Sequence, residues 1–193
     1  MRQRLVAVLA GAVVIATGVT APALAAEQAG PVGATAQFEG RQISLAQGWG
    51  EARSCVVFSD TDTRCFRTNA EANAAVGWDK ATDSKVVSVA KARGVAPESV
   101  TDINDCANLW FCLFEHENGH GRRLIFNEEK WHDLAIWNFH YKMSSYHNRQ
   151  IRWDNGGLEY HLPGGARQVD VEYWELSPSV GGEYNDRARL VHG

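Results

Sequence analysis

Residues 106–126 read CANLWFCLFEHENGHGRRLIF and are typical of a β-rich protein. The segments 110–114 and 122–126 have the apolar and aromatic composition of strands, and the glycines between them are typical of a turn. This pattern predicts a hairpin, with Cys106 and Cys112 at its first strand. Aromatic strands and glycine-containing turns continue from there to the end of the chain.

A second hairpin is predicted further along the same part of the chain. Residues 150–153 and 158–162 alternate apolar and polar side chains, and Asn155-Gly156 between them supplies two residues that tolerate a positive φ. We therefore expect a tight turn at Asn155-Gly156. Ile151 and Trp153 are expected to share one face of the first strand.

A weak internal repeat also runs through the C-terminal part. It aligns Leu113 with Leu158 and Gly119 with Gly164. Two similar units of short strands suggest paired Greek keys.

Residues 106–148 resemble the bacterial βγ-crystallin-like domains, in particular their secreted peptidase inhibitors, the bacterial metalloproteinase-inhibitor family. The resemblance is carried by Cys106-x5-Cys112 with the following Leu113-Phe-Glu-His116, by Trp131-x-Asp133-Leu134 and by Lys142-Met-Ser-Ser145. It implies a mostly β chain whose C-terminal part is a βγ-crystallin-like double Greek-key sandwich, with the second key at residues 149–193. It also implies inhibition of a peptidase, with a metalloproteinase as the target.

The resemblance further implies a degenerate calcium site. The family's calcium motif combines two Asn or Asp residues with a downstream Ser-Ser pair. Ser144 in the first key and Asn185 with Asp186 in the second supply part of this set, and because Ca²⁺ takes six to eight oxygen ligands, a composite site is expected to be weak. The alternative is that Ser144 and Ser145 hydrogen-bond a turn, while Asn185-Asp186 is an ordinary surface loop. No other cofactor is expected.

The first residues have the features of a secretory signal peptide. Arg2 and Arg4 precede the apolar run 5–19, and Ala23-Leu-Ala25 supplies small residues for cleavage. The run is shorter than the about 20 residues that a membrane span needs. We therefore expect residues 1–25 to be removed and the protein to be secreted to the extracellular space, with residues 26–37 as a loose mature N-terminus.

Four cysteines remain in the exported chain and predict disulfides: Cys55, Cys65, Cys106 and Cys112. Three pairings are open to four cysteines. The short separations favour Cys55–Cys65 and Cys106–Cys112. A zinc site is the alternative, and the lack of a C-x-x-C pair disfavours it.

Charge and composition exclude several classes of partner. The net charge of −4, from 19 Lys and Arg against 23 Asp and Glu, argues against nucleic acid and anionic membranes, because both require a basic surface. With 45% hydrophobic residues and seven tryptophans, the chain can bury a core of its own. We therefore expect a soluble monomer.

The N-terminal half is expected to be organised differently from the C-terminal half. Residues 38–93 are predicted to form a small α+β extension, joined by a linker at 94–105 to the Greek-key domain at 106–193.

Local signals place the elements of that extension. The strand-like residues around Cys55 and Cys65 flank a polar turn, so this disulfide would close a hairpin. Thr68 with Glu71 forms a capping box that predicts a short helix. Residues 83–93 are expected to form a second helix that ends at Gly94.

His116-Glu-Asn-Gly-His120 matches the H-E-x-x-H motif of zinc metallopeptidases. That motif works on a helix, which places both histidines on one face. Asn118, Gly119 and Gly121 disfavour a helix here, so we expect a turn without a catalytic metal, and a protein that is not an enzyme.

Three classes of function follow from these observations. The first is a secreted, disulfide-bonded inhibitor of an extracellular peptidase, such as a metalloproteinase. The second is a secreted binding module for cell-wall glycans, or an antimicrobial protein, on the same fold, because exposed tryptophans can stack on sugars. The third is a small enzyme built on the histidines between 116 and 147, which requires three metal ligands to converge.

Overall fold

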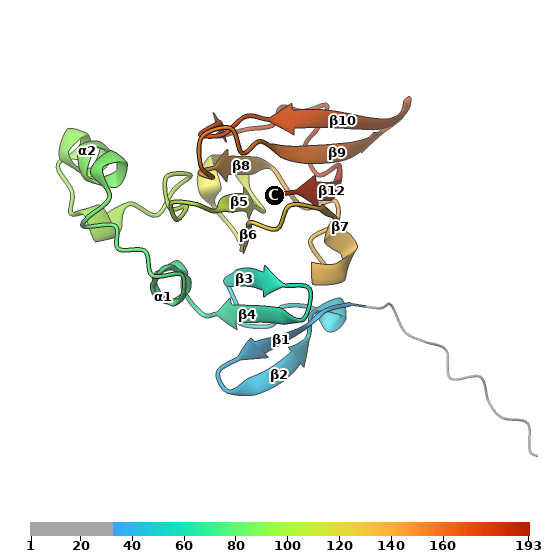
Figure 1. The fold of residues 1–193 in the computed structure, drawn as a ribbon, viewed down its shortest axis with the longest axis horizontal. Helices are drawn as coiled ribbons and strands as arrows, with labels where there is room; N and C mark the ends of the chain where they lie inside the picture. The colour runs from blue at the N-terminus through green and yellow to red at the C-terminus, as the bar shows by residue number, and fades with distance from the viewer. Residues whose placement is uncertain (1–32) are drawn as a thin grey trace, which may run out of the picture. The chain divides into compact units, whose positions relative to one another are not determined.

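The computed structural model describes residues 33–193 (Figure 1). The expected signal peptide, residues 1–25, and residues 26–32 lie outside the described residues. The expected loose N-terminus ends before residue 37, because Thr35–Phe38 forms the first strand and pairs with strands on both sides.

The described part of the chain is mostly β, with two sheets and two α-helices. The elements before residue 100 are β1 (Thr35–Phe38), β2 (Arg41–Ser44), η1 (Leu45–Gln47), β3 (Ser54–Ser59), β4 (Asp62–Phe66), α1 (Asn69–Ala75), α2 (Ser84–Arg93) and η2 (Pro97–Ser99), where η denotes a 3₁₀ turn. Those after residue 100 are β5 (Phe111–Phe114), η3 (Glu117–Gly119), β6 (Arg123–Phe126), β7 (Trp131–Asp133), η4 (Leu134–Trp137), β8 (Ser145–Asn148), β9 (Gly156–Leu162), β10 (Gly165–Val171), β11 (Leu176–Ser177) and β12 (Ala188–His192).

The strands form an eight-stranded sheet of order β11-β8-β5-β6-β3-β4-β1-β2 and a four-stranded sheet of order β10-β9-β12-β7. A Greek key has the spatial order 4-1-2-3. When β5, β6, β7 and β8 are numbered 1 to 4, the neighbouring strands β8-β5-β6 of the large sheet have the order 4-1-2. The third strand of this motif, β7, lies in the other sheet. Strands β12-β9-β10 repeat this order, and their third strand, β11, lies at the edge of the large sheet. Each motif thus contributes one strand to the sheet of the other.

The N-terminal hairpin continues the large sheet. Strand β3 pairs in parallel with β6, with Cys55 opposite Leu124, and β4 pairs with β1. The boundaries expected at 38–93, 94–105 and 106–193 therefore do not separate two domains, because both halves share one sheet and the described residues, 33–193, belong to one compact unit. The expected linker is also not free of the fold, since Ile103, Asn104 and Asp105 at its end are buried.

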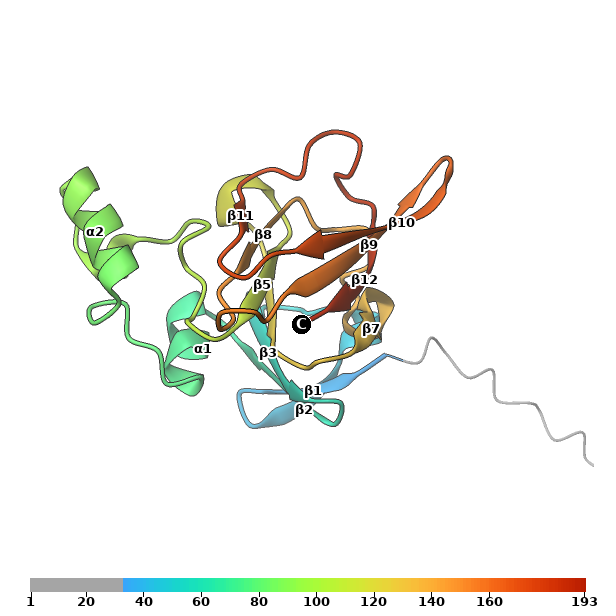
Figure 2. The same cartoon turned by 45° about the horizontal axis from the view of Figure 1, so that its top comes forward.

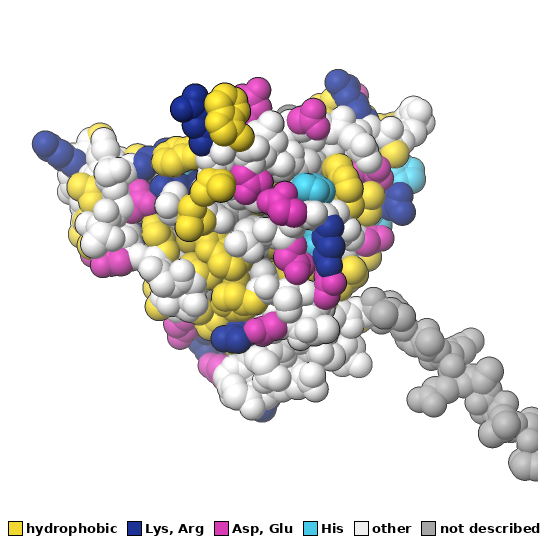
Figure 3. Space-filling model, viewed as in Figure 1, with side chains coloured by type: hydrophobic (Ala, Val, Ile, Leu, Met, Phe, Trp, Pro, Cys, Tyr) yellow, Lys and Arg dark blue, Asp and Glu magenta, His cyan; other side chains and the backbone are white. Residues whose placement is uncertain are grey.

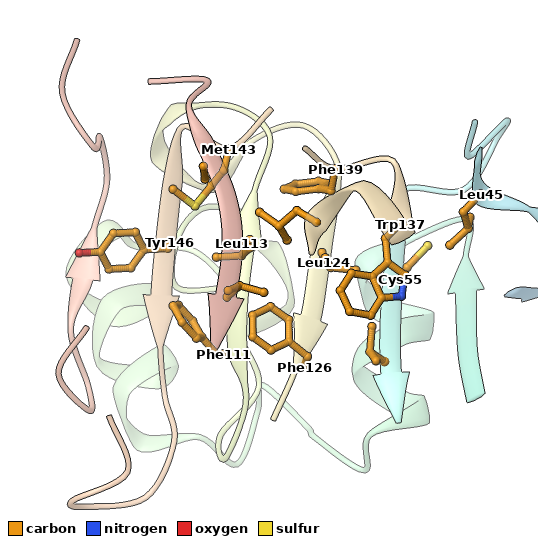
Figure 4. Close-up of a cluster of buried hydrophobic side chains, with 14 of the residues drawn as sticks. Leu45, Cys55, Phe111, Leu113, Leu124, Phe126, Trp137, Phe139, Met143 and Tyr146 are labelled. Atoms are coloured by element: carbon orange, nitrogen blue, oxygen red, sulfur yellow. The ribbon is translucent and has the colours of Figure 1, made fainter. Parts of the chain in front are cut away.

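One hydrophobic core joins the two sheets and the N-terminal strands (Figure 4). Trp49, which follows η1, is 1% exposed, and its indole N–H donates to the carbonyl of Trp137 at 2.6 Å. The indole of Trp137 in turn donates to the hydroxyl of Thr63 at 3.2 Å. Figure 4 shows how side chains from strands far apart in the sequence meet in this core: Leu45, Cys55, Phe111, Leu113, Leu124, Phe126, Trp137, Phe139, Met143 and Tyr146.

The structure contains two disulfides, Cys55–Cys65 and Cys106–Cys112. They are the pairs that the spacings favour. Cys55 and Cys65 face each other across β3 and β4, so their bond closes that hairpin. Cys106–Cys112 ties the segment before β5 to the strand itself.

The two helices begin and end where their capping residues indicate. Thr68 and Glu71 form the capping box of α1. The carboxylate of Asp83 accepts from the amides of Lys85 and Val86 at the start of α2, and Gly94 ends α2 in the left-handed conformation.

A buried polar network connects these helices to the sheet. Arg123 and Asp105 are both fully buried, and their side chains form an ion pair. The ammonium of Lys80 lies 2.9 Å from the Asp105 carboxylate, and the Asn73 amide donates to it at 2.8 Å. The guanidinium of Arg123 donates to the hydroxyl of Ser54 at 3.0 Å. This network fixes α1 against β3 and β6.

The hairpin expected at Asn155-Gly156 is wrong. The hairpin of this region joins β9 to β10 through Pro163-Gly164, and its tip projects from the sheet (Figure 2). Gly156 and Gly157 are instead the first two residues of β9, and a Cβ atom at Gly156 would lie 2.6 Å from the Phe111 ring. Close packing, and not a turn, requires glycine there.

Within residues 33–193, no helix is long and apolar enough to cross a membrane. The longest described α-helix is α2, whose exposed residues include Lys91 and Arg93.

Candidate functional site

Three loops meet at the end of the sheets where β5 and β9 begin: residues 107–110, 149–155 and 172–175. We call them the loop cluster. The amide of Leu109 donates to the carbonyl of Arg149 at 2.9 Å, which joins the first loop to the second. The amide of Tyr173 donates to the side-chain oxygen of Asn155 at 3.1 Å, which joins the second to the third.

The loop cluster exposes large apolar side chains. Trp153 is 75% exposed, Ile151 59%, and Leu109 and Trp174 49% each. The strand on which Ile151 and Trp153 were expected to share one face does not form, because residues 150–155 are loop. In Figure 3 hydrophobic side chains at the upper left lie beside Lys and Arg side chains, in the region that Figure 1 assigns to these loops and α2. Contiguous exposed apolar groups of this kind mark binding surfaces.

Three of these exposed residues have strained backbones. The φ angles are 73° at Leu109, 74° at Trp153 and 64° at Trp174. Bulky residues rarely adopt positive φ, and each such position costs on the order of 1–3 kcal/mol, which the surrounding structure must offset. Strain of this kind is concentrated at functional sites, so it points to the same surface as the exposure does.

Arg149 holds the loop cluster in place from below. It is 2% exposed, and its guanidinium donates to the carbonyl of Cys106 at 2.9 Å and pairs with Asp83 at 2.8 Å. Its guanidinium carbon also lies 5.6 Å from the ring centroids of both Trp78 and Trp174. Cys106, whose carbonyl accepts this hydrogen bond, is also covalently tied to Cys112 by a disulfide. The loops are therefore anchored by a covalent bond, an ion pair and two cation–π contacts.

Asp83 is ionised in this arrangement. Burial raises the pKa of Asp83, but hydrogen bonds from the Val86 amide and the Trp78 indole, together with the charge of Arg149, lower it by more. The pKa therefore lies below its ordinary value. The carboxylate is needed to balance the buried guanidinium.

A cleft of about 340 Å³ opens between the loop cluster and α2. Its lining combines aromatic rings with charges of both signs and includes Trp78, Asp83, Lys85, Asn108, Arg149 and Trp174. Burial, and then the charge of Arg149, lowers the pKa of Lys85. The cleft can accept a polar side chain next to the exposed aromatic residues.

The residues expected to bind calcium lie near one another, but their side chains form hydrogen bonds with other groups of the protein. The amide of Asp186 donates to the carbonyl of Met143 at 3.1 Å, which brings this loop beside Ser144. The Ser144 hydroxyl donates to the carbonyl of Glu115 at 2.9 Å, and the Asn185 amide donates to the Asp186 carboxylate at 2.9 Å. One carboxylate is a poor donor set for Ca²⁺. Calcium binding here stays a prediction.

The H-E-x-x-H segment forms a turn. His116 precedes η3, Asn118 is left-handed with φ of 58°, and the amide of His116 donates to the carbonyl of His120 at 3.0 Å. The Ser145 hydroxyl donates to the carbonyl of His116 at 2.6 Å and accepts from the amide of Gly119 at 3.1 Å. The helix that a metallopeptidase motif requires is not formed at these residues.

The sequence patterns missed the loop cluster for a physical reason. The apparent turn at Asn155-Gly156 is absent because Gly156 begins β9 and packs against Phe111, which lies far away in the sequence. A local signal for exposure is present in the sequence, since Trp153 lies between Arg152 and Asp154 and Glu175 follows Trp174.

The fold and the loop cluster together define a disulfide-bonded β-sheet protein whose loops expose large apolar side chains. Comparison with protein families gives a more specific result: the model of Peptidase inhibitor family I36 matches residues 101–155. The matched segment spans β5 to β8, the Cys106–Cys112 disulfide and two of the three loops of the loop cluster. It confirms the resemblance to the βγ-crystallin-like inhibitors for this part of the chain. No curated protein and no solved structure matched the chain.

Proposed function

We propose that this protein is a secreted peptidase inhibitor that binds its target through the loop cluster. The observation that carries the proposal is the exposed, strained Trp153 on a loop that the inhibitor-family segment contains and that Arg149 anchors. A metalloproteinase is the proposed target, in line with the resemblance of residues 106–148.

Rigidity explains why such a surface inhibits well. Association costs free energy when loops and side chains lose freedom, so a loop that is already ordered retains more of its contact energy. Tryptophan is also over-represented among residues that dominate binding energy. We therefore assign Trp153 as the main anchor, with Leu109 and Trp174 around it and the adjacent cleft as a pocket for a polar side chain of the target.

We further propose that the fold is a βγ-crystallin-like double Greek key. The support is the repeated 4-1-2 strand order and the exchange of the third strands, β7 and β11. Leu113 and Leu158, which the internal repeat aligns, lie in β5 and β9, the first strands of the two motifs.

The proposed molecule acts outside the cell as a monomer. Two disulfides are typical of exported proteins and support secretion. The shared core of the two sheets gives the chain enough buried apolar surface to fold without a partner.

Glycan binding is the competing function for exposed aromatic residues. Sugar-binding platforms use coplanar rings, but the rings of Trp153 and Tyr173 meet at 59° with centroids 5.8 Å apart. The geometry therefore favours insertion into a pocket of a protein over stacking on a flat sugar.

The proposal is tested by titrating the oxidised protein, residues 26–193, into a thermolysin-like metallopeptidase and following casein hydrolysis. Serine and cysteine peptidases form parallel arms, and a protein-only arm measures intrinsic hydrolysis. We expect saturable inhibition of the metallopeptidase near one-to-one stoichiometry. Inhibition of another peptidase class alone would replace the target, and unchanged hydrolysis in every arm together with retention on insoluble cell-wall glycan would contradict the inhibitor function.

A further inference from the structure

Three potential metal ligands meet outside the loop cluster. Asp60 lies in the turn between β3 and β4, Glu128 in the loop between β6 and β7, and His132 in β7. One ligand atom of each lies within 4.8 Å of those of the other two. Within residues 33–193 this is the one group of three or more His, Cys, Asp or Glu side chains that is arranged in this way.

A buried, unpartnered imidazole points into this group. The side chain of His132 is 5% exposed, and its Nε2 lies 3.1 Å from Oε2 of Glu128. Despite that distance, neither atom has a partner with hydrogen-bond geometry in the described structure. Leaving buried polar atoms without partners costs free energy, so a shared third atom between them would stabilise both.

The surrounding structure holds two of these ligands, His132 and Glu128, in place. His132 pairs with Val191 in the sheet, and its ring packs against Trp137 with centroids 5.3 Å apart. The carbonyl of Glu128 accepts from the amides of Lys130 at 2.8 Å and Gly193 at 3.2 Å. Ligands fixed by packing and backbone bonds lose little freedom when they bind a cation.

We propose that Asp60, Glu128 and His132 form a binding site for a divalent transition-metal cation, with Zn²⁺ as the best-fitting ion. Zn²⁺ accepts imidazole nitrogen and carboxylate oxygen as ligands, and a water molecule can complete a tetrahedron around three protein ligands. Zn–N and Zn–O bonds of about 2.0–2.2 Å place neighbouring ligand atoms roughly 3.3 Å apart. The 3.1 Å between Nε2 of His132 and Oε2 of Glu128 matches this spacing.

Lys130 acts as the competing cation. Its ammonium bonds the carboxylate of Asp60, and its side chain is 46% exposed. It can therefore move into solvent when a divalent ion takes its place. Removal of this ammonium would strengthen metal binding, whereas removal of the Asp60 carboxylate would weaken it.

Metal binding would also connect distant parts of the chain. Asp60 belongs to the N-terminal hairpin, whereas Glu128 and His132 belong to the segment that the inhibitor family matches. A shared cation would cross-link the two and raise thermal stability by mass action. This inference does not depend on the peptidase-inhibitor function.

The test is calorimetric titration of the oxidised protein with ZnCl₂ in a buffer that does not chelate zinc. The described cysteines are disulfide-bonded and do not compete. We expect one equivalent to bind, Asp60→Asn to weaken binding at least tenfold and Lys130→Met to strengthen it several-fold. Asp60 is exposed, so Asp60→Asn is expected to fold, and Asp62→Asn in the same hairpin is the matched control with unchanged affinity.

Thermal unfolding with and without ZnCl₂ gives a second readout, in which wild type but not Asp60→Asn gains stability. Absence of binding in wild type overturns the proposal. Equal affinity of Asp60→Asn and wild type also overturns it, because Asp60 would then not be a ligand. Loss of binding in His161→Gln overturns it as well, because that result places the ion at a surface imidazole.

Discussion

Gly156 leaves room for the Phe111 ring, and this gives a prediction at the scale of one residue. A Cβ atom there would lie 2.6 Å from the ring and 3.0 Å from the carbonyl oxygen of His192. We expect Gly156→Ala to lower the free energy of unfolding by roughly 1–3 kcal/mol, the usual cost of overpacking. Guanidinium denaturation with intact disulfides measures it.

Gly164→Ala is the matched control, because nothing lies within 4 Å of its added Cβ atom. It should change the free energy of unfolding by less than about 0.5 kcal/mol. Equal effects of the two substitutions would contradict the packing explanation.

The buried imidazole of His147 leads to a prediction of how the free energy of unfolding depends on pH. Burial first, and then the Lys85 ammonium, lower its pKa to about 3 from an ordinary value of 6.5. Its Nδ1 lies 2.9 Å from the carbonyl of Ile103. Because the folded state binds this proton less readily than the unfolded state, the contribution of the neutral imidazole is complete above about pH 6.5 and is lost as the pH falls towards 3.

We therefore expect the free energy of unfolding of wild type to fall between pH 6.5 and 4 more steeply than that of His147→Gln. Denaturation curves at several pH values measure both slopes. Parallel profiles would show that carboxylates alone cause the acid sensitivity.

Residue-scale expectations succeeded where their cause is local. The capping box at Thr68, the helix end at Gly94 and both disulfide pairs depend on neighbours in the sequence. The role of Gly156 depends on a ring from another strand, so the Asn155-Gly156 signal was misleading.

At the scale of elements, the network around Asp105 joins α1, β3 and β6. Asp105→Asn would remove the charge that balances the buried Arg123 and Lys80. Breaking such a buried pair costs about 3–5 kcal/mol, so we expect a loss of that order in the free energy of unfolding. Chemical denaturation measures it.

Asp62→Asn is the control for this prediction, since it breaks the exposed pair with Arg64. Exposed pairs contribute about 0–1 kcal/mol. Similar losses for both variants would contradict a structural role specific to Asp105. Sequence patterns could not find this network, because its members come from segments up to 69 residues apart.

The loop cluster also has a pH-dependent contact with the loop before β7. Burial, and then the neighbouring carboxyl group of Asp154, raise the pKa of Glu129 to about 6. A raised pKa stabilises the protein below about pH 4.5, and this contribution disappears as the pH rises through 6. We expect the difference in Tm between Glu129→Gln and wild type to become more favourable to the variant from pH 4.5 to pH 8.

Glu183→Gln, which alters another exposed glutamate, should show no such trend. Differential scanning fluorimetry at the two pH values distinguishes the variants. A constant difference for Glu129→Gln would indicate that Asp154 does not influence it.

At the scale of the whole molecule, the sequence indicated a mostly β chain and the family of its central segment, but not how the halves combine. The parallel pairing of β3 with β6 joins strands that no turn connects. Periodicity within a strand does not identify its neighbour. The sequence therefore predicted a linker at 94–105 between two units whose strands in fact belong to one sheet.

The measurement that tests the account most directly is the inhibition constant of Trp153→Ala against the metallopeptidase that the wild type inhibits. Trp153 is exposed, so its removal should leave the fold intact while weakening inhibition at least ~10-fold, as expected for an anchor residue. Tyr141→Ala is the control, because Tyr141 is 41% exposed with φ of 57° but lies at the other end of β8. Full inhibition by Trp153→Ala, or equal weakening by both variants, would contradict binding through the loop cluster.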